Sequence, residues 1–408
     1  MFSISPTSCS IGGFSTSIHL TTPLCKTLTV ILDAGSTAGL SSLPITHPKQ
    51  CSNPLIFLSH GHVDHTSGLW GFARAWGMAN GNKTLTVYVP EGLKEQFERV
   101  RDAVDSLDGK FDSLPPPPKE TSFSNGEKST RKPKPGLSET IQFTGLLPGT
   151  TTPIPDVRLD DGSTLEVRTF ATNHCEADGG VWDGSASSKP RSLGYVFVCR
   201  EKKKLKSPFN SLPKNEIHSA IKTHGVDNVY ESESERGVVP AFTYTGDCHG
   251  DYLVEQSEER GGEGWQNYKN IFNPKTAATE LTESTFALLT QSNINRQTGF
   301  LAPLYLCELT YIERGEQWRN YAWAWQHVCI DGVEDIFRSN GWWKVESEER
   351  KLVFFHLSNR YVGREDFVRE CLFSWEGRKV GWVGGGGEVK WLTESDDTTT
   401  ITTTVVNS

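Results

Sequence analysis

A short apolar segment that ends in a cluster of potential metal ligands is the feature that most restricts how this chain can fold. Residues 55–58, Leu-Ile-Phe-Leu, form a continuous apolar run, which predicts a buried strand. Imidazole and carboxylate side chains follow directly, and these are the ligand types that zinc and similar divalent ions take from proteins. The four candidate ligands are His60, His62, Asp64 and His65.

The spacing of these four residues suits two neighbouring ions. His60 and His62 are two positions apart, so on extended backbone both side chains point to the same side and can hold one ion together. Asp64 and His65 lie about half a turn further on and can face a second ion. The alternative is a polar loop that happens to be rich in histidine. So dense a cluster directly after a strand favours the metal site.

Composition restricts the class of protein. The 408 residues, 36% of them apolar, are enough for one large domain or two ordinary ones with a real core. No apolar run is long enough to span a bilayer, and residues 1–20 lack the pattern of a secretory signal. Nine dispersed cysteines without a CxxC pair indicate a reducing compartment, so we expect a cytoplasmic or nuclear protein, or one found in both, with no membrane partner. The formal charge of −9 means that local basic patches would have to contact any nucleic acid.

Predicted strands and helices alternate along the chain, which indicates an α/β fold in a single domain over residues 1–393. Two stretches rich in proline or polar residues, about 107–140 and 256–290, are predicted to be flexible surface insertions. The threonine-rich tail 394–408 is predicted to be disordered. The predicted strands are 8–20, 27–33, 55–58, 84–89, 165–170, 193–199, 241–245, 304–308 and 352–356, and the predicted helices are 69–79, 92–106, 215–223 and 326–338.

Further candidate ligands lie at the ends of later strands. His174 and His356 each lie at or just after the end of a predicted strand, and Asp247 follows Gly246, which lets the backbone bring a carboxylate close. Two ions need about seven or eight protein ligands between them. The predicted sets are His60, His62, His174 and Asp247 for one ion, and Asp64, His65, Asp247 and His356 for the other, with Asp247 as the bridge.

Two further polar features each have two interpretations. Asp33, at the end of the strand 27–33, either supports the metal ligands from behind or caps a neighbouring turn. The densest basic cluster, residues 200–206, is either a phosphate-binding surface or the solvated tip of a hairpin.

With these residues identified, the sequence resembles a known family. Ser59-His-Gly-His-Val-Asp-His65 is similar to the signature of the metallo-β-lactamase superfamily. Phe354-Phe-His-Leu-Ser-Asn-Arg-Tyr361 is similar to the closing motif of ribonuclease Z, the endonuclease family that trims the 3′ ends of precursor tRNA. Further matches are Leu193-Gly-Tyr195, Thr245-Gly-Asp247 and Glu308-Leu-Thr310, and Lys204-Leu-Lys206, Asn215-Glu-Ile217 and Gly225-Val226 resemble the short, plant-type members.

This resemblance implies a metallo-β-lactamase-like αββα sandwich with surface insertions that binds two divalent ions, with zinc the expected metal. The implied reaction is hydrolysis of a phosphodiester in precursor tRNA by a hydroxide bound to both ions, with Asp64 orienting that nucleophile. His327, oriented by Glu308, is implied as the acid that protonates the leaving 3′ oxygen. Dimerisation is common in the family, so a homodimer is compatible with the resemblance. The implied substrate-binding residues are Lys202, Lys203, Lys204, Lys206 and Arg360.

The chain also departs from the family. It has no Gly-Pro-rich arm at 200–245, where the basic cluster lies instead. The hydroxyl residue that usually follows His327 is missing, so a structural hydrogen bond is the alternative role of that histidine. Cys248 replaces the usual threonine after Asp247 and is either a weak extra ligand or, as we favour, a space-filling residue.

Two other functions remain open. One is a metallo-β-lactamase-fold hydrolase of another phosphodiester or of a (thio)ester, such as a cyclic nucleotide, which the missing arm and the acidic charge favour. The other is a metal-bearing interaction protein without turnover, which the complete set of ligands disfavours.

Overall fold

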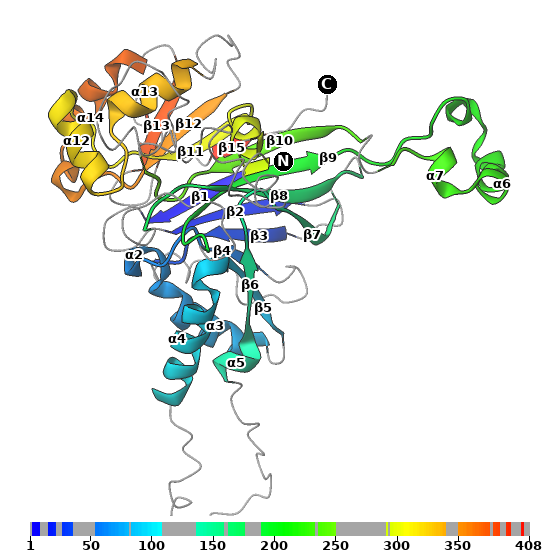
Figure 1. The fold of residues 1–408 in the computed structure, drawn as a ribbon, viewed down its shortest axis with the longest axis horizontal. Helices are drawn as coiled ribbons and strands as arrows, with labels where there is room; N and C mark the ends of the chain where they lie inside the picture. Colours follow the sequence, from blue (N-terminus) through cyan, green and yellow to red (C-terminus); the bar gives the residue numbers. More distant parts are fainter. Residues whose placement is uncertain are drawn as a thin grey trace, which may run out of the picture.

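The computed structural model consists of two β-sheets packed face to face, with helices on both outer faces and one arm that leaves the body (Figure 1). For residues 2–8, 15–21, 27–29, 155–158, 323, 339 and 401–403 only the backbone is described. The residues described are 2–8, 15–21, 27–35, 54–80, 83–107, 136–158, 162–175, 189–232, 236–249, 291–292, 294–339, 350–375, 378–383, 389–392 and 401–403.

The first sheet has seven strands in the order β15-β1-β2-β3-β4-β5-β6. Strands β3 to β6 are parallel, so their carboxyl ends meet at one edge of the sheet. The single strand predicted over 8–20 is wrong, because two antiparallel strands, β1 and β2, occupy this region. The strands are β1 (Phe2–Ser8), β2 (Ser15–Thr21), β3 (Thr27–Leu32), β4 (Leu55–Phe57), β5 (Leu85–Pro90), β6 (Ile141–Leu146) and β15 (Ile401–Thr403).

The second sheet has eight strands in the order β14-β13-β12-β11-β10-β9-β8-β7. Strands β10 to β13 are parallel, and β9 is antiparallel to both of its neighbours. The strands are β7 (Thr151–Arg158), β8 (Thr164–Ala171), β9 (Leu193–Arg200), β10 (Val238–Tyr244), β11 (Leu304–Glu308), β12 (Lys351–Phe355), β13 (Lys379–Val383) and β14 (Val389–Trp391).

Strand β9 shows why the central strands are apolar at nearly every position. Tyr195 and Phe197 face the core between the two sheets, whereas Val196 and Val198 face the core between the second sheet and its helices. Because alternate side chains point to opposite faces, a strand buried on both sides needs apolar residues throughout.

Helices cover the outer face of each sheet and complete the four layers. Side chains of α3 and α4 join one apolar core with the first sheet, and those of α13 and α14 join another with the second sheet. The predicted αββα sandwich is therefore confirmed. The helices are α2 (Val63–Thr66), α3 (Gly68–Asn80), α4 (Lys94–Leu107), α5 (Leu137–Thr140), α6 (Lys214–His224), α7 (Val226–Val229), α12 (Glu316–Ala324), α13 (Ile330–Ser339) and α14 (Glu365–Cys371). Short 3-10 helices span Glu91–Leu93, Phe209–Ser211, Asn359–Tyr361 and Phe373–Trp375.

Several predicted segments differ from the structure or lie outside it. The helix predicted over 326–338 begins only at Ile330, because Gln326 has a φ of 57°. Most of the predicted insertion 107–140 and all of 256–290 lie outside the described residues, although 137–140 forms α5. Within the tail 394–408 the structure describes β15, which pairs with β1. Among the helices described, none has the length and apolar character needed to cross a membrane.

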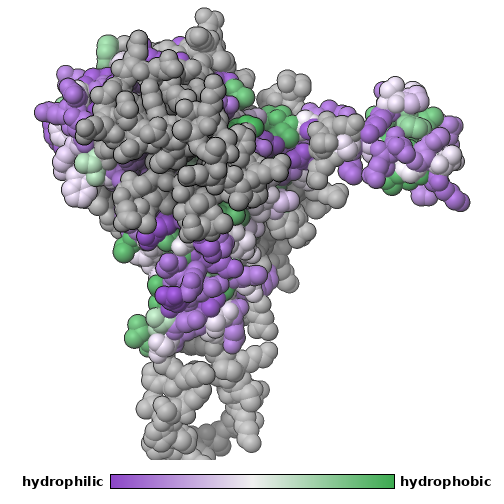
Figure 2. Space-filling view, in the orientation of Figure 1, coloured by the Kyte–Doolittle hydropathy of each residue, from purple (hydrophilic) through white to green (hydrophobic). Residues whose placement is uncertain are grey.

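The connection between β9 and β10 forms the arm that leaves the body and carries α6 and α7 (Figure 1). Its stem is held by backbone hydrogen bonds, in which Lys206 N–H donates to Val229 O and Glu231 N–H donates to Lys204 O. The surface of the arm is mostly hydrophilic (Figure 2). The sequence lacks the Gly-Pro-rich arm of the family, but a helical arm occupies this position.

Candidate metal centre

The structure brings all seven predicted ligands together at one edge of the sandwich. Each lies just past the end of a strand or on the short helix that follows one. The strand ends of both sheets gather at this edge, which brings the seven side chains together. His60 and His62 follow β4, Asp64 and His65 lie on α2, and His174, Asp247 and His356 follow β8, β10 and β12.

Asp247 occupies the centre of this group, which is the position that a bridging ligand would need. Its Oδ2 atom lies between 3.4 and 3.8 Å from the Nε2 atoms of four histidines. Ligand atoms that share one zinc ion at ordinary bond lengths are roughly 3.3–3.6 Å apart. The four distances are 3.7 Å to His60, 3.4 Å to His65, 3.8 Å to His174 and 3.4 Å to His356.

The remaining contacts divide the ligands into the two predicted sets. On one side, His62 Nδ1 lies 3.3 Å from His174 Nε2. On the other side, Asp64 Oδ2 lies 3.4 Å from His356 Nε2 and 3.6 Å from His65 Nε2.

Hydrogen bonds on the outer nitrogens orient four of the histidine rings. Nδ1 of His60 donates to Ser59 Oγ at 2.9 Å, and Nδ1 of His174 donates to the backbone oxygen of Gln326 at 2.6 Å. Nδ1 of His65 and of His356 have oxygen partners as well, Asp33 at 2.7 Å and Thr310 at 3.1 Å. With the proton on Nδ1, the Nε2 lone pair of each ring is directed at the centre, as a metal ligand requires.

Asp33 fulfils both of the roles considered for it. Its carboxylate accepts hydrogen bonds from His65 Nδ1 at 2.7 Å and from the backbone N–H of Ser59 at 2.6 Å. The hydroxyls of Ser59 and Tyr244 donate to it at 2.7 and 2.5 Å. Asp33 therefore both supports a candidate ligand and fixes the backbone at the end of β4.

Two buried polar atoms at the centre indicate that a pair of metal ions fits between the candidate ligands. His60 Nε2 and Asp247 Oδ1 are buried and have no hydrogen-bond partner among the described residues. A buried polar atom without a partner is costly, and divalent cations at this position would satisfy both atoms. The donor set of imidazoles and carboxylates fits such ions.

Electrostatics supports the same conclusion. Burial lowers the pKa of His60 well below its ordinary value and that of His174 to about 4, so both rings are neutral at pH 7 and keep a lone pair for a metal. Burial opposes ionisation of Asp247, but nearby His356 and His65 outweigh it and hold the pKa of Asp247 well below its ordinary value.

Gly246 explains how Asp247 reaches this position. Its φ of 62° lies in the left-handed region, and a Cβ at this residue would lie 2.3 Å from Cβ of Ser59. The turn that follows β10 can pack against the turn that follows β4 only because residue 246 has no side chain.

His327, which is partly buried, and Glu308, which is fully buried, form a hydrogen-bonded pair beside the candidate ligands. His327 Nδ1 donates to Glu308 Oε1 at 2.7 Å, and its ring centroid lies 4.9 Å from that of His174 and 5.3 Å from that of His356. Burial lowers the pKa of His327, but the charge and the hydrogen bond of Glu308 outweigh it and raise the pKa to about 9. The pair therefore holds a protonated imidazole against the candidate centre at neutral pH.

The two cysteines near the centre differ in position. Cys248 is fully buried in the apolar core beneath the helices and belongs to none of the candidate ligand clusters found among the described residues. Cys175, which is not among the predicted ligands, lies with its Sγ 3.1 Å from His62 Nε2. Its position directly after His174 is the feature of the sequence that could have identified it as a candidate ligand.

The four predicted substrate-binding lysines lie away from the centre. Strand β9 starts at the metal edge, where Leu193 N–H donates to Ser59 O, and ends at Arg200 at the foot of the arm. At a rise of ~3.3 Å per residue, its length separates the lysines from the centre by roughly 23 Å. Lys202 and Lys203 are exposed, and Lys204 pairs with Glu201 at 2.5 Å. Lys206 lies on the same stem.

Arg360 belongs to a different surface. Its guanidinium lies 4.6 Å from the ring centroid of Trp318 and 3.4 Å from the carboxylate of Glu313. Tyr311 links this aromatic cluster to His327, with their ring centroids 6.4 Å apart.

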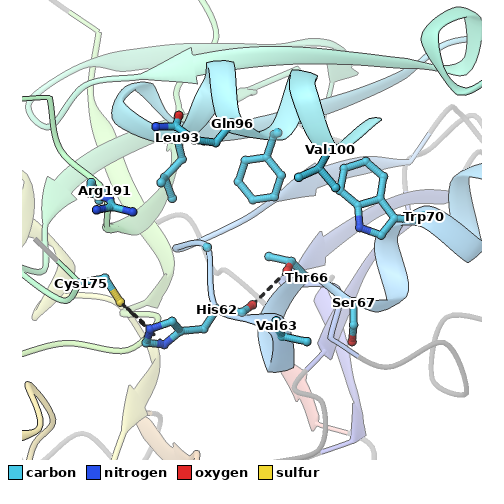
Figure 3. Close-up of a pocket in the computed structure, with 12 residues that line it drawn as sticks. His62, Val63, Thr66, Ser67, Trp70, Leu93, Gln96, Val100, Cys175 and Arg191 are labelled. Atoms are coloured by element: carbon cyan, nitrogen blue, oxygen red, sulfur yellow. Dashed lines mark hydrogen bonds between the residues drawn. The ribbon is translucent and has the colours of Figure 1, made fainter. Parts of the chain in front are cut away.

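A pocket of about 500 Å³ opens beside His62 (Figure 3). Its wall is mainly apolar and includes Trp70, Leu93 and Phe97. His62, Cys175 and Arg191 supply polar groups on the side of the candidate centre (Figure 3).

Comparison with known proteins gives one family and several similar structures. Residues 26–175 match the model of the Metallo-beta-lactamase superfamily. No curated protein matches the chain in sequence. A long form RNase Z from yeast is 14% identical with a TM-score of 0.44, over 88% of this chain and 38% of that one, so the chain spans well under half of its length.

Two other similar structures have lengths close to that of this chain. The metallo-beta-lactamase fold protein YhfI from Bacillus subtilis is 11% identical with a TM-score of 0.44, over 94% of this chain and 97% of that one. Unliganded yeast PDE1 is 10% identical with a TM-score of 0.47, over 94% of this chain and 98% of that one.

Proposed function

Because residues 26–175 match the model of the metallo-β-lactamase superfamily, we propose that this chain is a metallo-β-lactamase-fold hydrolase and an endoribonuclease that removes the 3′ trailer of precursor tRNA with two divalent ions, zinc being the expected metal. The observation that carries the proposal is the His327–Glu308 pair beside two candidate ligands. Hydrolysis of a phosphodiester needs an acid for the leaving oxygen, and this pair supplies one.

Two divalent ions, when bound, lower the pKa of a water molecule and offset the charge of the scissile phosphate. Asp64 is the candidate ligand that orients the attacking water, because its side chain is 22% exposed whereas that of Asp247 is 1% exposed. Asp64 can therefore accept a hydrogen bond from a solvent molecule that enters the site.

The proton for the leaving 3′ oxygen comes from His327. Glu308 is fully buried and accepts hydrogen bonds from the backbone N–H of Cys248 at 2.6 Å and from Thr310 Oγ1 at 2.5 Å, which fixes its carboxylate. Glu308 in turn fixes the ring of His327 and keeps it protonated. We therefore favour a role for His327 as the acid over a purely structural hydrogen bond.

A large substrate suits the positions of the basic and aromatic residues. The lysines of the arm are roughly 23 Å from the centre by the rise of β9, so a small ester bound at the centre would not reach them. Tyr321 and Trp325 are about half exposed and contact one another, and the ring of Tyr321 also contacts that of Tyr311. Such rings suit the unstacked bases of a single-stranded RNA end.

The second candidate is a hydrolase of a smaller ester, such as a cyclic nucleotide. The pocket beside His62 favours it, because apolar walls and Arg191 suit one base with its phosphate.

One experiment distinguishes these functions. The protein is incubated with a 3′-extended tRNA, a cyclic nucleotide and a thioester, each with and without a chelator, and Asp64→Ala serves as the inactive control. We expect chelator-sensitive cleavage of the tRNA alone, leaving a 3′ hydroxyl. Products that end in a 3′ phosphate, or turnover of only a small ester, would contradict the proposal.

A further inference from the structure

Cys175 lies among three of the candidate metal ligands. Its Sγ is 3.1 Å from Nε2 and 3.7 Å from Nδ1 of His62 (Figure 3). One ligand atom from each of four side chains lies within 4.8 Å of all the others. These side chains are His60, His62, His174 and Cys175.

The spacing of these atoms agrees with ligation of one shared zinc ion. With Zn–N near 2.05 Å and Zn–S near 2.3 Å, two nitrogens are roughly 3.3 Å apart, and a nitrogen and a sulfur are roughly 3.6 Å apart. His62 Nδ1 is 3.3 Å from His174 Nε2 and 3.7 Å from Cys175 Sγ. The distances from His62 Nδ1 to His174 Nε2 and to Cys175 Sγ are therefore both those expected for atoms that bind the same ion.

The backbone holds Cys175 in this position. Asn173 and Cys175 both have positive φ values, 55° and 60°, which residues other than glycine rarely adopt. The N–H of Cys175 donates to Gln326 Oε1 at 2.7 Å, and the N–H of His174 donates to Ser192 Oγ at 2.8 Å. Strained backbone that is fixed by polar contacts is typical of functional positions.

An independent observation also indicates a ligand here. His60 is fully buried, its Nδ1 is bonded to Ser59, and its Nε2 has no hydrogen-bond partner among the residues described. That imidazole belongs to the same four-residue group as Cys175.

We propose that Cys175 is a thiolate ligand of the ion held by His60, His62 and His174. Binding would release the thiol proton to solvent, and Asp247 would still contribute the carboxylate shared with the second ion. A sulfur donor favours zinc over manganese or magnesium, so this site would be zinc-selective whereas the second, built from imidazole and carboxylate, would be less so. The inference rests on the metal centre and is independent of the substrate.

The test uses cobalt(II) as a spectroscopic substitute for zinc in the full-length protein. We expect a sulfur-to-cobalt charge-transfer band in the near ultraviolet. The band should be lost in Cys175→Ser, which keeps its d–d bands because the histidines still bind. Cys371→Ser, a change at another partly buried cysteine, should keep the charge-transfer band. Cobalt that binds without this band in the unmodified protein, or a band that persists in Cys175→Ser, would overturn the proposal.

A second measurement needs no variant. Alkylation of Cys175 by iodoacetamide, followed by mass spectrometry, should be at least tenfold slower with zinc bound than after chelation, whereas alkylation of Cys371 should change little. Equal modification of Cys175 with and without zinc would contradict ligation. Neither measurement involves RNA cleavage, so a failed tRNA assay would not affect this inference.

Discussion

The carboxylate of Asp33 lies 2.7 Å from Nδ1 of His65, while Nε2 of the same ring lies 3.4 Å from Asp247. His65 is thus held between two carboxylates, one behind the candidate centre and one within it. Burial lowers the pKa of His65, but the two carboxylates outweigh it and raise the pKa well above its ordinary value. A negative partner of this kind makes the ring a stronger electron donor.

Asp33→Asn should weaken metal binding while leaving the fold intact. Asparagine has nearly the same volume and tolerates the φ of 56° found at this residue, but it lacks the charge that acts on His65. We expect a loss of metal affinity of about 10- to 100-fold. Competition with a chromophoric chelator measures it, and circular dichroism checks the fold. Unchanged affinity would show that Asp33 has only its backbone role.

Glu308→Gln should shift the pH dependence of cleavage. The proposed proton donor, His327, has a raised pKa of about 9, so the rate should fall as pH rises through that region. Without the charge of Glu308 this pKa falls, and the alkaline limb of the profile should move to lower pH. His327→Asn should slow cleavage by about 10²–10⁴-fold.

The control for this pair is metal content, which neither substitution should reduce. A substrate with a good leaving group, such as a nitrophenyl phosphodiester, needs no acid and should lose little rate in His327→Asn. Equal loss for both substrates would indicate a purely structural role for His327.

Gly246→Ala should destabilise the protein and displace Asp247. A left-handed φ costs a residue with a side chain about 1–2 kcal/mol, and the overlap with Ser59 adds about 1–3 kcal/mol. Gly363→Ala is a matched control, because Gly363 has a φ of 74° and a Cβ added there would have no described atom within 4 Å. Thermal unfolding should show a larger loss for Gly246→Ala, together with a loss of bound metal that Gly363→Ala does not share.

Charge removal on the arm should weaken binding of tRNA and leave the chemistry unchanged. Lys202→Ala combined with Lys203→Ala should raise KM for tRNA and reduce the salt dependence of binding, because fewer phosphates are contacted. Cleavage of a nitrophenyl phosphodiester should be unaffected. Lys379→Ala, at an exposed position on β13, is the control, and an equal effect from it would contradict a specific role for the arm.

The ligand loop could be predicted from the sequence because its ligands are close together in the chain and directly follow a strand. Four potential ligands follow one apolar run, and His174, Asp247 and His356 each lie at or just after the end of another predicted strand, so strand ends alone place them at the same edge of the fold. The predicted helix 215–223 also agrees closely with α6, Lys214–His224.

The features that were missed depend on backbone conformation or on distant contacts. Cys175 and Gln326 both have positive φ values. The first turns the Cys175 side chain towards the centre, and the second delays the start of α13. The spacing of apolar residues in the sequence does not predict a positive φ at a single residue. The two strands β1 and β2 were merged into one because alternation alone does not mark the turn between them. The projection of the arm depends on how the body packs and could not be predicted from a local helix pattern.

The length of β9 has a consequence for where a substrate would be cut. This strand is buried along nearly all of its length and connects the metal edge to the foot of the arm, so its span cannot adjust. If the arm binds the body of a tRNA, β9 acts as a fixed ruler between the point of grip and the point of cleavage. The cut position would then be selected by distance along the RNA as well as by the bases beside it.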